Sequence, residues 1–260
     1  METSKSYAFQ LIIDFEDAVS GVERDKLYHD FFTLAGKPHD LWVRLPLGAD
    51  PEENASVIKT FIAQGCKRFV LPKLTDTAAY RKLDQALPNE LSLMYILLVE
   101  HPRLLLELKD ILQDDKQGRI QYVSLGSHDL MSVIGGSHTL EQLYFPRYQV
   151  LYLARAYGIK AIDIASMNIS NEMGFKEEVV NGLTAGYDAK YLLHPRQASW
   201  YLEALHDNDL VSWAQHIIQQ LPENFVVDEV EPFVLNGQVI EKPHLLKAVG
   251  ILQKNKKYGK

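Results

Sequence analysis

Acidic side chains follow several short apolar runs of this sequence, at the points where the runs end. The run "LIID" leads into Glu16 and Asp17, and later runs lead to Glu100 and to Asp129. Carboxylates that converge in a partly buried site repel one another, and a divalent cation cancels that repulsion. Mg²⁺ takes one or two protein carboxylates together with water and substrate oxygens. We therefore predict a Mg²⁺ site with Glu100 and Asp129 as its direct ligands.

Two basic residues accompany these carboxylates. Arg44, in a neighbouring run, offers a bidentate grip on a substrate carboxylate, and Lys73 ends the next run. A cation, an arginine and acidic groups together indicate chemistry on an oxyanion next to a carbonyl. Arg44 has a structural alternative, an ion-pair network with Asp14 or Glu16. Lys73 could form a Schiff base, but pairing with the acidic residues is the favoured interpretation.

Two of the carboxylates also have structural explanations. Asp129 can cap a helix that begins at Leu130, and Asp17 can cap or favour a helix N-terminus. The histidines that follow the apolar runs lack the spacing of zinc ligands, so a zinc site is not expected. His194, before Pro195, is expected to have a structural role.

The apolar runs themselves predict strands of a parallel sheet, because they are apolar on both faces and are separated by amphipathic segments. Strand, helix and strand alternate, which favours a TIM-type (β/α) barrel over a doubly wound sheet. No glycine-rich dinucleotide or phosphate loop follows any run. The predicted strands are residues 7–14, 41–46, 68–73, 92–100, 120–126, 160–166 and 190–195.

The pattern changes after about residue 200. A helical stretch is followed by two short strands around Asn236-Gly237, a pair typical of a hairpin turn, and then by a last helix. We therefore expect a (β/α) barrel over residues 1–200 and a C-terminal appendage of helices and a hairpin over 201–260.

Composition limits the function. The chain has 260 residues and a net charge of −7, which does not suit a general nucleic-acid binder. The one cysteine, Cys66, suits a reducing cytoplasm. The sequence has neither an apolar signal-peptide core nor a membrane-length apolar run. We expect a cytoplasmic protein without a membrane or nucleic-acid partner.

Eight short motifs, in order, resemble the HpcH/HpaI aldolase and citrate lyase family, and most closely its citrate lyase beta subunits and related acyl-CoA lyases. The motifs span most of the chain, from the first strand to the C-terminal appendage. They are "DFEDAV" (14–19), "VRLP" (43–46), "VLPKL" (70–74), "VEHP" (99–102), "LGSHDLMSVIG" (125–135), "ARAYGIKAID" (154–163), "LLHPRQ" (192–197) and "VLNGQVIEKP" (234–243).

The resemblance implies a TIM-type barrel with Mg²⁺ held by Glu100 and Asp129. It implies that Arg44 grips the carboxylate of a keto or hydroxy acid, and that Glu16 and Asp17 organise this arginine and the waters at the metal. Lys73 joins the substrate-binding residues. Few residues precede "DFEDAV" here, whereas the family has a further strand and helix before it. We therefore expect the barrel to lack that first strand and helix.

The resemblance also implies an acid in the C-terminal segment that reaches the site of a neighbouring subunit, usually in a homotrimer. Glu241 stands where the family has an aspartate. The implied function is a Mg²⁺-dependent carbon–carbon lyase with Claisen- or aldol-type chemistry on a small keto or hydroxy acid, free or as a CoA thioester. The alternatives are a diverged accessory paralogue that binds a keto acid or metal, and a pyruvate-type aldolase.

Overall fold

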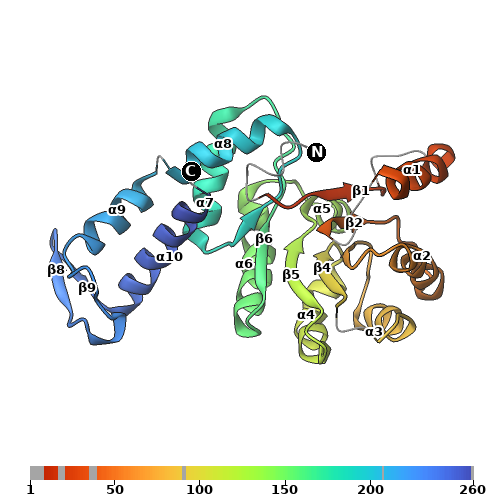
Figure 1. Cartoon of the computed structure of the whole chain (residues 1–260), viewed down its shortest axis with the longest axis horizontal. Coiled ribbons are helices and arrows are strands. Elements are labelled where there is room, and N and C mark those ends of the chain that lie inside the picture. The colour runs from red at the N-terminus through yellow and green to blue at the C-terminus, as the bar shows by residue number, and fades with distance from the viewer. Residues whose placement is uncertain (1–8, 17–20, 35–39, 90–91, 207, 259–260) are drawn as a thin grey trace. The chain divides into compact units, whose positions relative to one another are not determined.

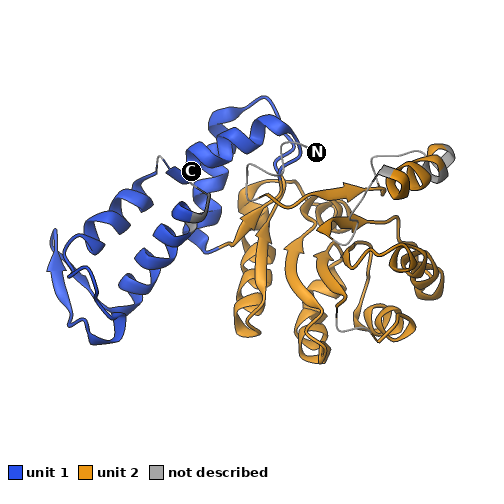
Figure 2. Ribbon diagram, viewed as in Figure 1, with its two compact units in different colours: residues 1–8, 166–186, 192–260 blue, residues 9–165, 187–191 orange. Residues whose placement is uncertain are grey.

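The structure, a computed structural model, describes residues 9–16, 21–34, 40–89, 92–206 and 208–258. The chain divides into two compact units (Figure 2). We call residues 9–165 and 187–191 the sheet unit, and residues 1–8, 166–186 and 192–260 the helical unit. Each is described by itself.

Within the described residues, the sheet unit holds a seven-stranded sheet whose order follows the chain from β1 to β7. All neighbouring pairs are parallel. A doubly wound sheet reverses its strand order at a switch point, so this sequential order excludes that topology. The strands are β1 (Ile12–Asp14), β2 (Trp42–Arg44), β3 (Arg68–Leu71), β4 (Met94–Val99), β5 (Ile120–Leu125), β6 (Lys160–Asp163) and β7 (Ala189–Lys190).

All seven predicted strands are thus confirmed, and each is shorter than predicted. The largest error is the last one. The residues after Lys190 do not continue the strand, because the N–H groups of Leu193 and His194 donate to the Gln197 side chain of helix α8. Helix α8 begins at Pro195, since proline suits the first turn of a helix.

Helices connect the strands of the sheet unit. Neighbouring helices pack against one another in the order α2, α3, α4, α6, and Figure 1 shows them following the sheet from strand to strand. They are α1 (Gly21–Leu34), α2 (Pro51–Ala63), α3 (Thr77–Ala86), α4 (Pro102–Asp114), α5 (Ser127–Ile134) and α6 (Leu140–Ala156).

Local sequence explains where these helices begin and end. The Asp50 side chain accepts the Glu52 N–H, and Pro51 occupies the first turn of α2. Gly65 follows α2 with a φ of +91°, which glycine adopts without steric cost. Helix α6 begins at Leu140, where the Thr139 hydroxyl accepts the Gln142 N–H and caps the first turn.

Both faces of the sheet are buried, which confirms the interpretation of the strands. Alternate residues form one apolar cluster, and the residues between them face the helices. The cluster comprises Trp42, Val70, Ile96, Leu98 and Ile162, with Ile12, Met94, Tyr122, Ala189 and Tyr191 packed against it. We call the face that carries this cluster the inner face. The opposite face includes Val43, Phe69, Leu97, Val123 and Ala161, all nearly inaccessible to solvent.

The helical unit contains the rest of the described elements. A small core of Ala214, Ile217, Ile240, Leu245 and Ala248 joins its last two helices to the hairpin. The turn residues Asn236 and Gly237 have φ of +49° and +78°, as expected for an Asn-Gly hairpin. The elements are α7 (Glu172–Ala185), α8 (Pro195–His206), α9 (Asp209–Ile218), the 3₁₀ turn η3 (Val227–Glu229), β8 (Phe233–Leu235), β9 (Gln238–Ile240) and α10 (Lys242–Tyr258).

The predicted domain boundary at residue 200 stays a prediction. In the structure, residues 166–186 group with the C-terminal segment in one compact unit. None of the described helices is long and apolar enough to cross a membrane.

Candidate active site

Polar residues follow the C-terminal ends of β1 to β5, and the parallel strands bring these ends to one edge of the sheet. Hydrogen bonds and ion pairs connect Asp14 at the end of β1, Glu16 after it, Arg44 at the end of β2, Lys73 after β3, Glu100 after β4, and Asp129 in the first turn of α5. We call these six residues the carboxylate cluster. The sequence predicted this convergence.

Arg44 lies next to the end of β1, because the parallel register pairs it with Asp14. Its Nε donates to Asp14 Oδ1 at 2.9 Å, and its Nη2 contacts Asp14 Oδ2. Its Nη1 lies 2.9 Å from Glu16 Oε2, and the Glu16 N–H donates to Asp14 Oδ1. The structural alternative for Arg44 is therefore confirmed. A contact between Arg44 and a substrate stays a prediction.

Lys73 joins the two predicted metal ligands. Its backbone N–H donates to Glu100 Oε2 at 2.7 Å, and its Nζ lies 3.0 Å from Asp129 Oδ1 and 3.8 Å from Glu16 Oε1. Burial alone would lower the pKa of Lys73, but the bond to Asp129 and the nearby carboxylates raise it above its ordinary value. A protonated amine cannot form a Schiff base, so the structure supports the predicted ion pairing.

The backbone of Lys73 has an unusual conformation. Its φ of +57° lies in the left-handed region, which non-glycine residues rarely adopt. Such conformations cost on the order of 1–3 kcal/mol and concentrate at functional sites. In this conformation the Lys73 N–H binds Glu100 while its ammonium group binds Asp129.

Glu100 is the most deeply buried ligand candidate, at 4% exposure. Burial raises its pKa to about 7, although the Lys73 N–H and ammonium oppose the shift. Gly126, after β5, makes room for it, because a Cβ at this position would lie 2.3 Å from Glu100 Cγ. Gly126 was not among the predicted site residues. Its position directly after an apolar run was the only feature of the sequence that pointed to it.

Asp129 lies in the first turn of α5 with 45% of its side chain exposed. The predicted helix start at Leu130 is wrong, because α5 begins at Ser127 and Asp129 is therefore not its cap. The neighbouring His128, for which the sequence gave no role, stacks on His138 with ring centroids 3.7 Å apart. An exposed aspartate beside a buried glutamate leaves one side of the pair open to solvent or a ligand.

The carboxylate cluster suits a divalent cation. Its four carboxylates face two basic side chains, so that two formal negative charges are left over. Glu100 and Asp129 supply oxygen ligands, and Mg²⁺ completes its shell with water and substrate oxygens. Among the described residues, no group of three or more acidic, histidine or cysteine side chains could hold a metal ion, so the protein itself offers only the two carboxylates. The donor set therefore fits an open Mg²⁺ site and not a closed structural one.

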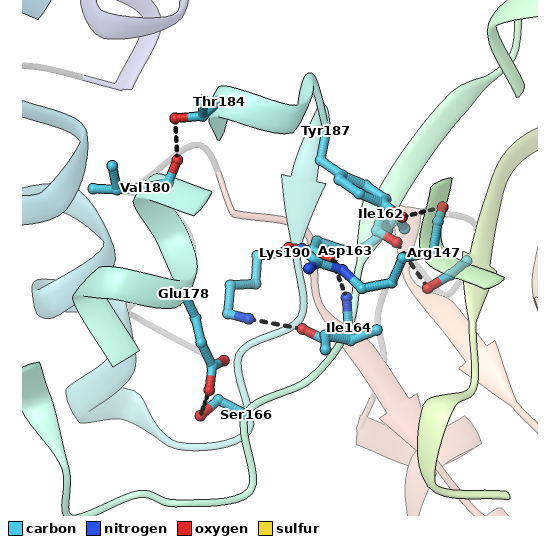
Figure 3. A network of polar contacts seen from close by, with 11 residues as sticks. Arg147, Ile162, Asp163, Ile164, Ser166, Glu178, Val180, Thr184, Tyr187 and Lys190 are labelled. Carbon is cyan, nitrogen blue, oxygen red and sulfur yellow. Dashed lines mark hydrogen bonds and ion pairs between the residues drawn. The ribbon is translucent and has the colours of Figure 1, made fainter. Parts of the chain in front are cut away.

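Asp163 at the end of β6 has a different role from the cluster acids. Both of its oxygens bind Arg147 of α6, at 3.0 and 2.8 Å, and Oδ1 also accepts the Ile164 N–H (Figure 3). The Tyr187 hydroxyl donates to the Arg147 carbonyl, and the Lys190 ammonium donates to the Ile164 carbonyl. This network fixes α6 against β6 and β7.

Neither of the two remaining predicted site residues belongs to the described part of the sheet unit. Asp17 lies outside the described residues. Glu241 belongs to the helical unit, where its carbonyl accepts the N–H of His244 and of Leu245 at the start of α10. His194, also in this unit, accepts the Arg196 N–H through Nδ1, in line with its expected structural role.

Comparison with known proteins places this site in context. The model of the HpcH/HpaI aldolase/citrate lyase family matches residues 2–195. The chain belongs to the HpcH/HpaI aldolase/citrate lyase family. The match covers every residue of the carboxylate cluster and confirms the prediction of a lyase-type enzyme made from the ordered motifs.

Relatives of this family member match along its length. The citrate lyase subunit beta of Leuconostoc mesenteroides subsp. cremoris is 24% identical over 95% of this chain and 85% of its own. The structure of CitE from Mycobacterium tuberculosis with magnesium, acetoacetate and coenzyme A has a TM-score of 0.80, at 21% identity over 98% and 93% of the two chains. A second CitE structure, with magnesium and pyruvate, has a TM-score of 0.71, at 20% identity over 97% and 92%.

Proposed function

We propose that this family member is a Mg²⁺-dependent carbon–carbon lyase that cleaves or condenses a small keto or hydroxy acid, free or as a CoA thioester. The observation that carries the proposal is the Lys73 bridge, because one residue binds both Glu100 and Asp129 at the open edge of the sheet. The magnesium, keto acid and coenzyme A in the CitE complexes named above support the same chemistry.

Each residue of the carboxylate cluster has its own role in this proposal. Glu100 and Asp129 would hold Mg²⁺, which supplies a Lewis acid that polarises a carbonyl oxygen. Arg44 would bind the substrate carboxylate, sharing its guanidinium with Asp14 and Glu16, which fix the guanidinium plane. Lys73 would neutralise Asp129 and add positive charge where the oxyanion develops.

Several further predictions remain part of this proposal. Asp17 would help to organise Arg44, and Glu241 would exchange the proton at the enolate carbon, reaching the site of a neighbouring subunit. The sequential parallel sheet supports an incomplete TIM-type barrel, and the lack of a first strand and helix stays a prediction. A cytoplasmic location stays a prediction from the single cysteine, Cys66, which is a free, buried thiol.

A homo-oligomer, with a trimer favoured, is supported by exposed apolar side chains of the sheet unit. Val133 and Ile134 at the end of α5, and Tyr144, Phe145 and Tyr152 on α6, are 52–68% exposed. We call these five residues the α5–α6 patch. Aromatic side chains are enriched in the buried core of protein interfaces.

A second candidate function is a diverged paralogue that binds a keto acid or metal but does little chemistry. The observation in its favour is that Asp14 and Glu16 already hold Arg44, the predicted carboxylate grip. A pyruvate-type aldolase is the third candidate, with the free keto acid as its carbon donor.

Solvent deuterium exchange separates the three functions. The protein would be incubated in D₂O with Mg²⁺ and pyruvate, acetyl-CoA or propionyl-CoA, and exchange followed by NMR, with Glu100→Gln as control. Exchange of a thioester supports the acyl-CoA lyase, and exchange of pyruvate alone supports the aldolase. The absence of exchange with all three compounds would contradict the enzyme proposal and favour the accessory protein.

A further inference from the structure

A tyrosine on the inner face of the sheet lies beside the carboxylate cluster. Tyr191 directly follows β7 and packs against the apolar cluster of the inner face. Its hydroxyl is buried, and no hydrogen-bond partner meets it among the residues that the structure describes. A buried hydroxyl without a partner costs about 1–3 kcal/mol, so this group calls for an explanation.

The alternation of the strands places Tyr191 on the same face of the sheet as the candidate site. Trp42, Leu98 and Ala189 belong to the inner apolar cluster or pack against it. Two residues further along the chain come Arg44, the last residue of β2, and Glu100 and Tyr191, which directly follow β4 and β7, so the alternation directs all three to the same face. Beyond the apolar cluster, the inner face thus carries an arginine, the buried carboxylate and an unsatisfied phenol.

Electrostatics agree with this placement. Burial raises the pKa of Tyr191 to about 12, and the charges of Arg44 and Glu100 both act on its phenol group. The Ser124 hydroxyl is close enough to the phenol to lower this pKa, but the two groups do not meet in hydrogen-bond geometry. Ser124 donates its own hydrogen to the Ile162 carbonyl at 2.9 Å. Tyr191 therefore remains protonated at neutral pH and is available as a donor.

We propose that the Tyr191 hydroxyl donates a hydrogen bond to an oxygen of the keto acid bound between Arg44 and Glu100. The inference rests on the proposed function and adds a residue to its substrate site. An oxygen-rich anion in that position provides the acceptor that the described residues do not, and it discriminates against ligands without an oxygen there.

The test compares Tyr191→Phe with the wild type by calorimetry, using pyruvate in the presence of Mg²⁺. We expect the variant to bind pyruvate about 10- to 100-fold more weakly, with Mg²⁺ affinity unchanged within about twofold. Tyr122→Phe changes a tyrosine that packs against the same apolar cluster; it is the matched control and should bind pyruvate like the wild type. The melting temperature of the metal-free Tyr191→Phe protein should not fall, because the lost hydroxyl has no partner.

Each other outcome has a distinct meaning. Equal pyruvate affinity in the wild type and Tyr191→Phe would overturn the inference and leave the proposed function intact. A clear fall in the melting temperature of Tyr191→Phe would also overturn it, since the hydroxyl would then have a partner such as Ser124 within the protein. A wild type that binds Mg²⁺ but no pyruvate would contradict the proposed function, and the inference with it.

Discussion

At the scale of single residues, Glu100 and Gly126 depend on each other. Glu100 is buried against the backbone of Gly126, where a side chain would overlap it. Glu100 could be predicted from the sequence, because a carboxylate directly after an apolar run is conspicuous. Gly126 and Tyr191 could not, because their importance comes from contacts with residues far away along the chain.

The contact between Gly126 and Glu100 gives a prediction. Gly126→Ala would place a Cβ 2.3 Å from Glu100 Cγ and displace the carboxylate. We expect the Mg²⁺ affinity to fall about 10- to 100-fold, as for other changes beside metal ligands, measured by calorimetry. Gly250→Ala in α10 is the control, because its Cβ would meet no atom within 4 Å. Wild-type affinity in Gly126→Ala would show that Glu100 does not need this space.

Burial of Glu100 also predicts that the stability of the metal-free protein depends on pH. Its pKa rises from 4.5 to about 7 in the folded protein, so the folded state keeps a proton that the unfolded state releases within this range. Glu100 therefore makes the metal-free protein less stable as the pH rises through this window, by roughly 3 kcal/mol in total. The Glu100→Gln variant should lack this loss of stability with rising pH. Urea unfolding in EDTA at about pH 5 and about pH 8 measures it, and an equal pH dependence in both proteins would mean that the Glu100 carboxyl is solvated.

At the scale of elements, the ion pair between Arg147 and Asp163 fastens α6 to β6 (Figure 3). Both side chains are at most 4% exposed. The sequence placed Asp163 in a strand but did not indicate its partner, because Arg147 lies in a different element and could equally have faced solvent. Strand and helix positions were predictable from apolar periodicity, whereas the pairing of charges across elements was not.

This ion pair is expected to matter more than an exposed one on the same helix. Arg147→Met would leave Asp163 buried without its counter-charge, at a cost of about 3–5 kcal/mol in unfolding free energy. Arg155, 43% exposed and paired with Asp188, serves as the control. Arg155→Met should cost less than about 1 kcal/mol. Denaturant titration compares the two, and equal losses would contradict a special role for the buried pair.

At the scale of the whole molecule, the α5–α6 patch predicts self-association. Phe145 is 67% exposed, and Phe145→Glu would place a charge in the core of the interface. We expect light scattering to report an oligomer for the wild type and a smaller species for this variant. Leu106→Glu changes an isolated leucine of α4 that is 70% exposed, and it should leave the assembly intact. A monomeric wild type, or equal dissociation of both variants, would exclude the patch as the specific interface.

The sequence predicted the parallel α/β character of the molecule and its C-terminal hairpin, because periodicity and turn residues are local signals. It did not predict that residues 166–186 group with the C-terminal segment. That grouping depends on packing between α7 and α8, two helices whose sequences equally suit the outside of a barrel.

The central claim is that Glu100 and Asp129 form a Mg²⁺ site. Calorimetric titration of the metal-free protein with Mg²⁺, beside Glu100→Gln and Asp129→Asn, tests it most directly. Each variant keeps the size of the side chain and removes one carboxylate charge, and circular dichroism would verify the fold. We predict that the wild type binds Mg²⁺ and that each variant loses this binding with its fold intact. Wild-type Mg²⁺ affinity in both variants would contradict the site.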